Sequence, residues 1–88
     1  MRREPDFFGE QELKLVFVAK KLKEALGLEK LLTDAGLDYL VETDKYSGGI
    51  IFRSERVGAF FYVLPEAVQA TRRVMLENGY RPHEEHEE

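Results

Sequence analysis

The sequence contains no cysteine, and no apolar run in it approaches the ~20 residues that a membrane-spanning helix needs. The lack of cysteine excludes disulfides, thiolate nucleophiles and sulfur-ligated metals. The start, MRREPDFFGEQE, carries two arginines but lacks the apolar stretch of a signal peptide. These absences predict a cytoplasmic protein with no membrane partner.

The inventory for catalysis is also small. Both histidines, His83 and His86, fall in the acidic tail, and Ser47 and Ser54 have no evident base. Three carboxylates remain open for acid–base chemistry, and nothing selects among them: Asp38, Glu42 and Asp44. We therefore expect a protein that is not an enzyme and has no catalytic residues, metal site or cofactor.

Size and charge set the class of protein. The chain has 88 residues, of which 43% are hydrophobic and 34% charged, as expected of one folded domain. The net charge of −4 comes largely from the tail at 83–88, which carries four glutamates. The remainder is nearly balanced, which disfavours nucleic acid as a partner. We expect an N-terminal arm at 1–12, a single α+β domain at 13–82 and the tail at 83–88.

Hydrophobic periodicity and breakers predict the elements. Helices are expected near 20–35 and 65–78, and strands near four ranges: 13–18, 38–43, 50–53 and 59–64. Gly36 and Gly79 fit the left-handed position that ends a helix. Pro65 suits the first helical position. This order predicts a ferredoxin-like split β-α-β sandwich, with a mixed sheet of about four strands and two helices on one face.

The stretch KYSGGIIFRSERVGAFFYV, at 45–63, favours a β-meander with a turn at 44–49 and a tight connection at 54–58. Phosphate cradles place glycines before a helix, whereas a strand is expected after Gly48 and Gly49. The glycine pair is therefore interpreted as a turn. The alternative is an anion nest formed by Lys45, Ser47, Gly48 and Gly49.

The predicted strands are apolar on both faces, and the helices can cover only one. One set contains Leu13, Leu15 and Phe17, and the opposite set contains Val16, Val18, Phe61 and Val63. The uncovered face is a dimer interface, a cover for Phe7 and Phe8, or a binding platform. The pattern does not decide which set faces the helices, because a one-residue shift exchanges the two faces.

Two segments resemble RNA-recognition domains, which are also ferredoxin-like. VFVAKKL, at 16–22, is similar to their first ribonucleoprotein motif, with Phe17 at the stacking position. RVGAFFYV, at 56–63, keeps about half of the second motif. This resemblance implies a single-stranded RNA-binding domain as the alternative function. The candidate binding residues are Phe17, Arg53, Arg56, Phe60 and Tyr62.

A second resemblance covers about residues 13–80. LKEALGLEKLLTDAGLDYLV and LPEAVQATRRVMLENG are similar to segments of small prokaryotic signal-transducing proteins, which are akin in fold to the PII nitrogen-regulatory proteins. The family brings no catalytic residues. Our leading hypothesis is therefore a non-enzymatic regulatory or protein-interaction module, bacterial in type. It would act as a homodimer through the helix-free sheet face, with a further protein partner unknown.

Overall fold

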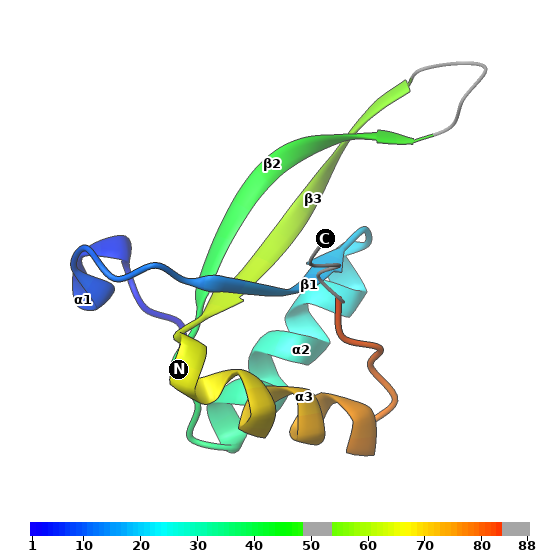
Figure 1. Ribbon diagram of the computed structural model, residues 1–88. Helices are drawn as coiled ribbons and strands as arrows, with labels where there is room; N and C mark the ends of the chain where they lie inside the picture. The colour runs from blue at the N-terminus through cyan, green and yellow to red at the C-terminus, as the bar shows by residue number, and fades with distance from the viewer. Residues whose placement is uncertain (49–53, 84–88) are drawn as a thin grey trace, which may run out of the picture.

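The computed structural model describes residues 1–48 and 54–83 and shows an α+β fold (Figure 1). The elements in chain order are α1 (Pro5–Phe8), β1 (Lys14–Ala19), α2 (Leu22–Asp34), β2 (Leu40–Gly48), β3 (Ser54–Val63), the 3₁₀ turn η1 (Pro65–Ala67) and α3 (Val68–Glu77). The α+β class is thus confirmed. Within the described residues, no helix is long and apolar enough to span a bilayer.

Both predicted helices are present, and their ends have the expected cause. α2 lies within the range 20–35, and the second helix begins as η1 at Pro65 before it continues as α3. Gly36 and Gly79 have φ angles of 76° and 84°. These left-handed angles suit glycine, as predicted, and allow the chain to leave each helix.

The sheet differs from the prediction. Its order is β1-β3-β2, and both outer strands pair antiparallel with β3, so β1 and β2 point the same way. The described part of the chain forms three strands in this sheet, not about four. The predicted strand at 50–53 lies outside the described residues. The final segment YRP, at 80–82, is not a strand.

The predicted turn at 44–49 and the predicted connection at 54–58 were wrong for the residues described. Pairing runs without a break from Leu40 opposite Tyr62 to Gly48 opposite Ser54, which makes one long hairpin. β1 ends where Ala19 lies opposite Ala59, so the rest of the hairpin is a two-stranded ribbon. The polar residues of this ribbon do not interrupt its strand pairing. A face that is not buried tolerates polar side chains, and neither face of the ribbon is packed under a third described strand.

Figure 1 shows α2 and α3 on the same side of the sheet, where they cover its apolar face. Among the described residues, the core between these layers contains nine: Val16, Ala19, Ala25, Leu28, Leu32, Tyr39, Phe61, Val63 and Met75. Phe61 is fully buried, and its ring stacks on that of Tyr39 at a centroid distance of 5.8 Å. The sheet therefore has one face under helices and one face free of them.

A β-bulge in β1 changes the expected alternation. The register with β3 shifts between Leu15 and Phe17, which places Val16 and Phe17 opposite a single residue, Phe61. Val16 belongs to the core, and Phe17 packs against it. Neither alternation set predicted for β1 is therefore correct, because the extra residue puts members of both sets on the helix side. Leu15 and Val18 occupy the other face.

Tyr39 gives the fold an expected weakness at alkaline pH. Its hydroxyl donates to the Glu29 carbonyl at 3.1 Å, and the Thr33 hydroxyl lies 3.1 Å away. Burial raises the pKa of Tyr39, although the Thr33 hydrogen bond partly opposes this shift. A phenol whose pKa is higher in the folded state than in the unfolded state makes its full contribution to stability at pH values below the unfolded pKa. That contribution is lost as the pH rises through the folded pKa.

We therefore expect the free energy of unfolding to fall between about pH 9 and about pH 11, across the ordinary tyrosine pKa of about 10. Urea denaturation at both pH values measures the fall. Tyr39→Phe should show a shallower fall, since it lacks the ionisable group. Tyr62, whose pKa is also raised, stays in both proteins and cancels in the comparison. Equal slopes for the two proteins would contradict the assignment.

Candidate functional site

The helix-free sheet face carries an apolar surface that we call the platform, formed by Leu15, Val18, Phe60 and Tyr62. Leu15 lies opposite Tyr62, and Val18 lies opposite Phe60, so cross-strand pairing places the four side chains on one face. All four are half-buried, and none belongs to the core or packs against it. The platform is thus a second apolar surface of the sheet, separate from the one under the helices.

β2 gives the platform an acidic side. Leu40 lies opposite Tyr62, Glu42 opposite Phe60 and Asp44 opposite Gly58. These three residues therefore point to the same face as Phe60 and Tyr62. Burial raises the pKa of the Tyr62 phenol, and the negative charges of Glu42 and Asp44 raise it further. The platform is consequently an aromatic surface beside exposed carboxylates, which repels phosphate groups.

The N-terminal arm docks at the start of β2. Arg3 donates its backbone N–H to the Tyr39 carbonyl at 2.8 Å, and its guanidinium donates to Asp38 at 2.8 Å. The same guanidinium lies 4.4 Å from the centre of the Phe7 ring. Phe8 is 3% exposed, whereas Phe7 is 51% exposed. Of the two phenylalanines expected to dock, only Phe8 is buried.

Phe8 and Leu40 are both buried, but neither belongs to the core that lies under the helices. Because Leu40 points to the helix-free face, we infer that the arm covers the end of this face near Leu40. The platform residues remain partly open beside it. One of the expected uses of this face, cover by the arm, therefore applies at most to the end near Leu40, and the use of the platform as an interface or a binding surface stays a prediction.

The structure does not bring the predicted RNA-stacking residues together. Phe60 and Tyr62 share the platform, but Phe17 lies on the helix side, because of the bulge. Its ring meets Phe61 at 6.4 Å and Tyr80 at 5.7 Å, both edge-on. A continuous stacking surface of the three aromatic residues is therefore absent.

The predicted arginines and the predicted anion nest lie on or near the hairpin. The backbone of Arg56 lies in β3 opposite Tyr46, and Arg53 is outside the described residues. In the predicted nest, Lys45, Ser47 and Gly48 lie in β2, not in a turn, and Gly49 is outside the described residues. The Lys45 backbone N–H donates to the carboxylate of Asp44 at 2.7 Å, so a carboxylate already uses this donor.

In the part of the chain that the structure describes, no group of three or more histidine and carboxylate side chains could hold a metal ion. Of the three carboxylates left open by the sequence, Asp38 binds Arg3, while Glu42 and Asp44 flank the platform. From these positions, no reaction can be assigned to any of the three carboxylates.

Sequence reasoning did not unite Leu15 and Val18 on one face, and it did not place Glu42 beside Phe60. Strict alternation separates Leu15 from Val18, and only the bulge unites them. Phe60 and Tyr62 were named on the resemblance to RNA-recognition domains, and the regular alternation of β3 places them on one face. Comparisons of the chain with protein-family models, with curated proteins and with solved structures found no match.

Proposed function

We propose that the protein is a non-enzymatic interaction module that forms a homodimer through the platform. The observation that carries this proposal is the location of Leu15, Val18, Phe60 and Tyr62, half-buried and outside the core. Two copies that meet face to face would bury these side chains and gain about 25 cal/mol for each Å² of apolar surface removed from water. An isologous contact of this kind suits a flat sheet face.

We further propose a ferredoxin-like arrangement and a regulatory role. The strand order β1-β3-β2, with α2 and α3 on one side, supports a split β-α-β unit. Residues 80–83 run beside the outer edge of β1, where the His83 N–H donates to the Val16 carbonyl at 2.6 Å. The resemblance to small signal-transducing proteins is the basis for regulation, and the small inventory of catalytic groups supports it.

Phe60→Glu is expected to convert a dimer into a monomer while the fold persists, because a charge buried at an interface without a partner costs several kcal/mol. Light scattering measures the mass, and circular dichroism the fold. Val57→Glu is the matched control, because Val57 is in the same strand, is 63% exposed and lines a hollow on the helix side with Leu22. It should leave the dimer intact.

A parent protein that scatters as a monomer of 10.2 kDa at every concentration would refute the dimer. The alternative function, single-stranded RNA binding, is supported by Phe60 and Tyr62 on one face. The carboxylates of Glu42 and Asp44 oppose it. Binding of a labelled oligonucleotide at low salt, abolished by Phe60→Ala, would favour this alternative, since the phosphate contribution is largest there.

A further inference from the structure

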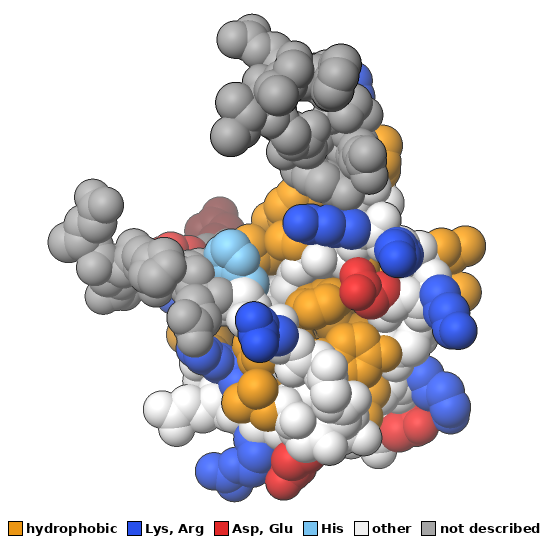
Figure 2. All heavy atoms as spheres, turned by 90° about the vertical axis from the view of Figure 1, so that its right-hand side faces the viewer, with side chains coloured by type: hydrophobic (Ala, Val, Ile, Leu, Met, Phe, Trp, Pro, Cys, Tyr) orange, Lys and Arg blue, Asp and Glu red, His pale blue; other side chains and the backbone are white. Residues whose placement is uncertain are grey.

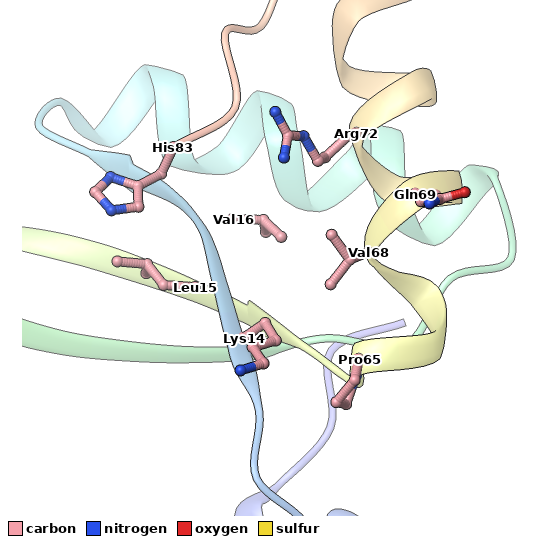
Figure 3. Close-up of a pocket in the computed structure, with 8 residues that line it drawn as sticks. All are labelled: Lys14, Leu15, Val16, Pro65, Val68, Gln69, Arg72 and His83. Carbon is pink, nitrogen blue, oxygen red and sulfur yellow. The ribbon is translucent and has the colours of Figure 1, made fainter. Parts of the chain in front are cut away.

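The platform by itself is too small for a stable dimer. Its four side chains, Leu15, Val18, Phe60 and Tyr62, are half-buried. Figure 3 shows that Leu15 points away from α3, whereas its neighbour Val16 points toward it. A half-buried side chain of this size exposes at most about 80 Å², so the four offer at most about 300 Å². A stable contact between proteins buries about 800 Å² on each partner. A homodimer through the platform therefore requires further surface on the same side of the sheet.

The N-terminal arm offers apolar surface on that side. Among the described residues, large apolar side chains that are more than half exposed are Met1, Phe7, Leu22, Leu26, Val57 and Leu76. The last four belong to α2, α3 or the helix side of β3. Figure 2, which views the molecule from the side away from α1, shows apolar side chains interspersed with charged ones. In this set, Phe7 is the aromatic residue, and it belongs to the arm.

Phe7 lies at the end of the helix-free face. Alternate residues of an extended segment share a face, so Asp38 points to the same side as Leu40. The Arg3 guanidinium donates to Asp38 at 2.8 Å and lies 4.4 Å from the centre of the Phe7 ring. Figure 1 shows α1, which contains Phe7, standing out from the strands on the side away from α2 and α3. The ring is therefore an exposed apolar surface that borders the platform.

The Phe7 ring is held in place within the single chain. It packs edge-on against Phe8 at 5.1 Å, and Phe8 is 3% exposed. The Arg3 guanidinium beside the ring is itself fixed, because the Arg3 backbone N–H donates to the Tyr39 carbonyl at 2.8 Å. A side chain that is already ordered loses little conformational entropy on association, and buried aromatic residues dominate the free energy of most interfaces. Phe7 thus has the properties of an interface anchor.

We propose that the homodimer contact includes the arm, and that Phe7 of each copy packs on the platform of the other. This inference rests on the homodimer proposed above. Because α1 stands out from the sheet at the Leu40 end, two arms at the same end would hold the platforms apart. The two-fold axis therefore runs across the strands. It places each arm at the far end of the other platform, next to the partner's Phe60.

Phe7→Ala is expected to raise the dissociation constant of the dimer at least about tenfold, because each dimer loses two anchoring rings. Analytical ultracentrifugation over a range of concentrations measures this constant. Leu76→Ala is the matched control, since Leu76 is 61% exposed on α3, and it should leave the constant unchanged. The amides of Arg3 and Tyr39, which are hydrogen-bonded between the arm and the start of β2, should stay protected from hydrogen exchange in Phe7→Ala.

Nuclear Overhauser contacts between an isotope-labelled copy and an unlabelled copy test the arrangement in the parent protein. We expect contacts from the Phe7 ring of one copy to the Phe60 ring of the other. Contacts between the two Phe7 rings, or none from Phe7, would overturn the proposal. So would a Phe7→Ala variant that dimerises as tightly as the parent. These results would leave the homodimer itself standing, whereas a parent protein that is monomeric at every concentration would overturn both.

Discussion

Phe61→Ala is expected to destabilise the protein by about 3–5 kcal/mol, whereas Phe60→Ala is expected to cost about 1 kcal/mol. Phe61 is fully buried, and its ring contacts Tyr39 at 5.8 Å and Phe17 at 6.4 Å. Phe60 is half-buried on the platform and belongs to no core contact. The two substitutions remove the same side chain from adjacent positions of one strand, so the difference reports which face each position serves.

Urea denaturation at one protein concentration measures both values. Small domains have total stabilities of about 5–15 kcal/mol, so Phe61→Ala should be at the limit of folding at room temperature. A variant that is unfolded without urea agrees with the expectation. Equal losses at a protein concentration low enough to keep both proteins monomeric would mean that both faces of β3 are buried within the monomer, which would also remove the basis for the homodimer.

The helices were predictable from sequence because their signals are local. Gly36, Gly79 and Pro65 each act within one turn of the helix that they limit, and the structure places them as expected. The apolar spacing of α2 likewise requires no knowledge of its neighbours. Local signals of this kind do not depend on which strand lies beside the helix.

The face of β1 was not predictable, because it is decided by a partner strand. Val16 and Phe17 look like members of opposite sets, and only the pairing with Phe61 places both toward the helices. This single bulge moved Phe17 away from Phe60 and Tyr62. It also created the pair of Leu15 and Val18, so the candidate site depended on a tertiary feature that the period of the sequence does not contain.

In the hairpin, sequence reasoning predicted a turn where the chain forms a strand. Asp44 and Lys45 suggest a turn by composition, yet both lie in β2 with partners in β3. Turn residues are recognised by their polarity, and a two-stranded ribbon beyond the core tolerates polarity equally well. The hollow between β1 and α3 was missed for a related reason, since Lys14, Arg72 and His83, which line it, are distant in sequence and meet only when α3 and residues 80–83 have packed.

Gly27 lies inside α2, where a glycine costs about 1 kcal/mol relative to alanine, and a close neighbour accounts for its presence. That neighbour is the Tyr80 side chain: a Cβ atom on residue 27 would overlap the Tyr80 Oη and would lie 3.7 Å from its Cζ. Tyr80 also packs edge-on against Phe17 at 5.7 Å. Gly27 thus leaves room for the residue that begins the segment 80–83.

Gly27→Ala is therefore expected to have opposite signs in two backgrounds. In the parent protein the gain in helix propensity of about 1 kcal/mol is outweighed by the contact with the Tyr80 hydroxyl, since overpacking costs about 1–3 kcal/mol. In a Tyr80→Phe background the hydroxyl is gone, and the ring carbon at 3.7 Å is an ordinary contact. Gly27→Ala should then stabilise the protein by about 1 kcal/mol.

Urea denaturation of the parent, the two single variants and the double variant gives the coupling energy, expected to be about 2 kcal/mol in favour of the double variant. The amide resonances of Val16 and His83 provide a second readout. Because their backbones are hydrogen-bonded, displacement of Tyr80 in Gly27→Ala should shift both resonances, and Tyr80→Phe should restore them. If Gly27→Ala stabilises both backgrounds equally, then Tyr80 does not pack on α2, and residues 80–83 are held by β1 alone.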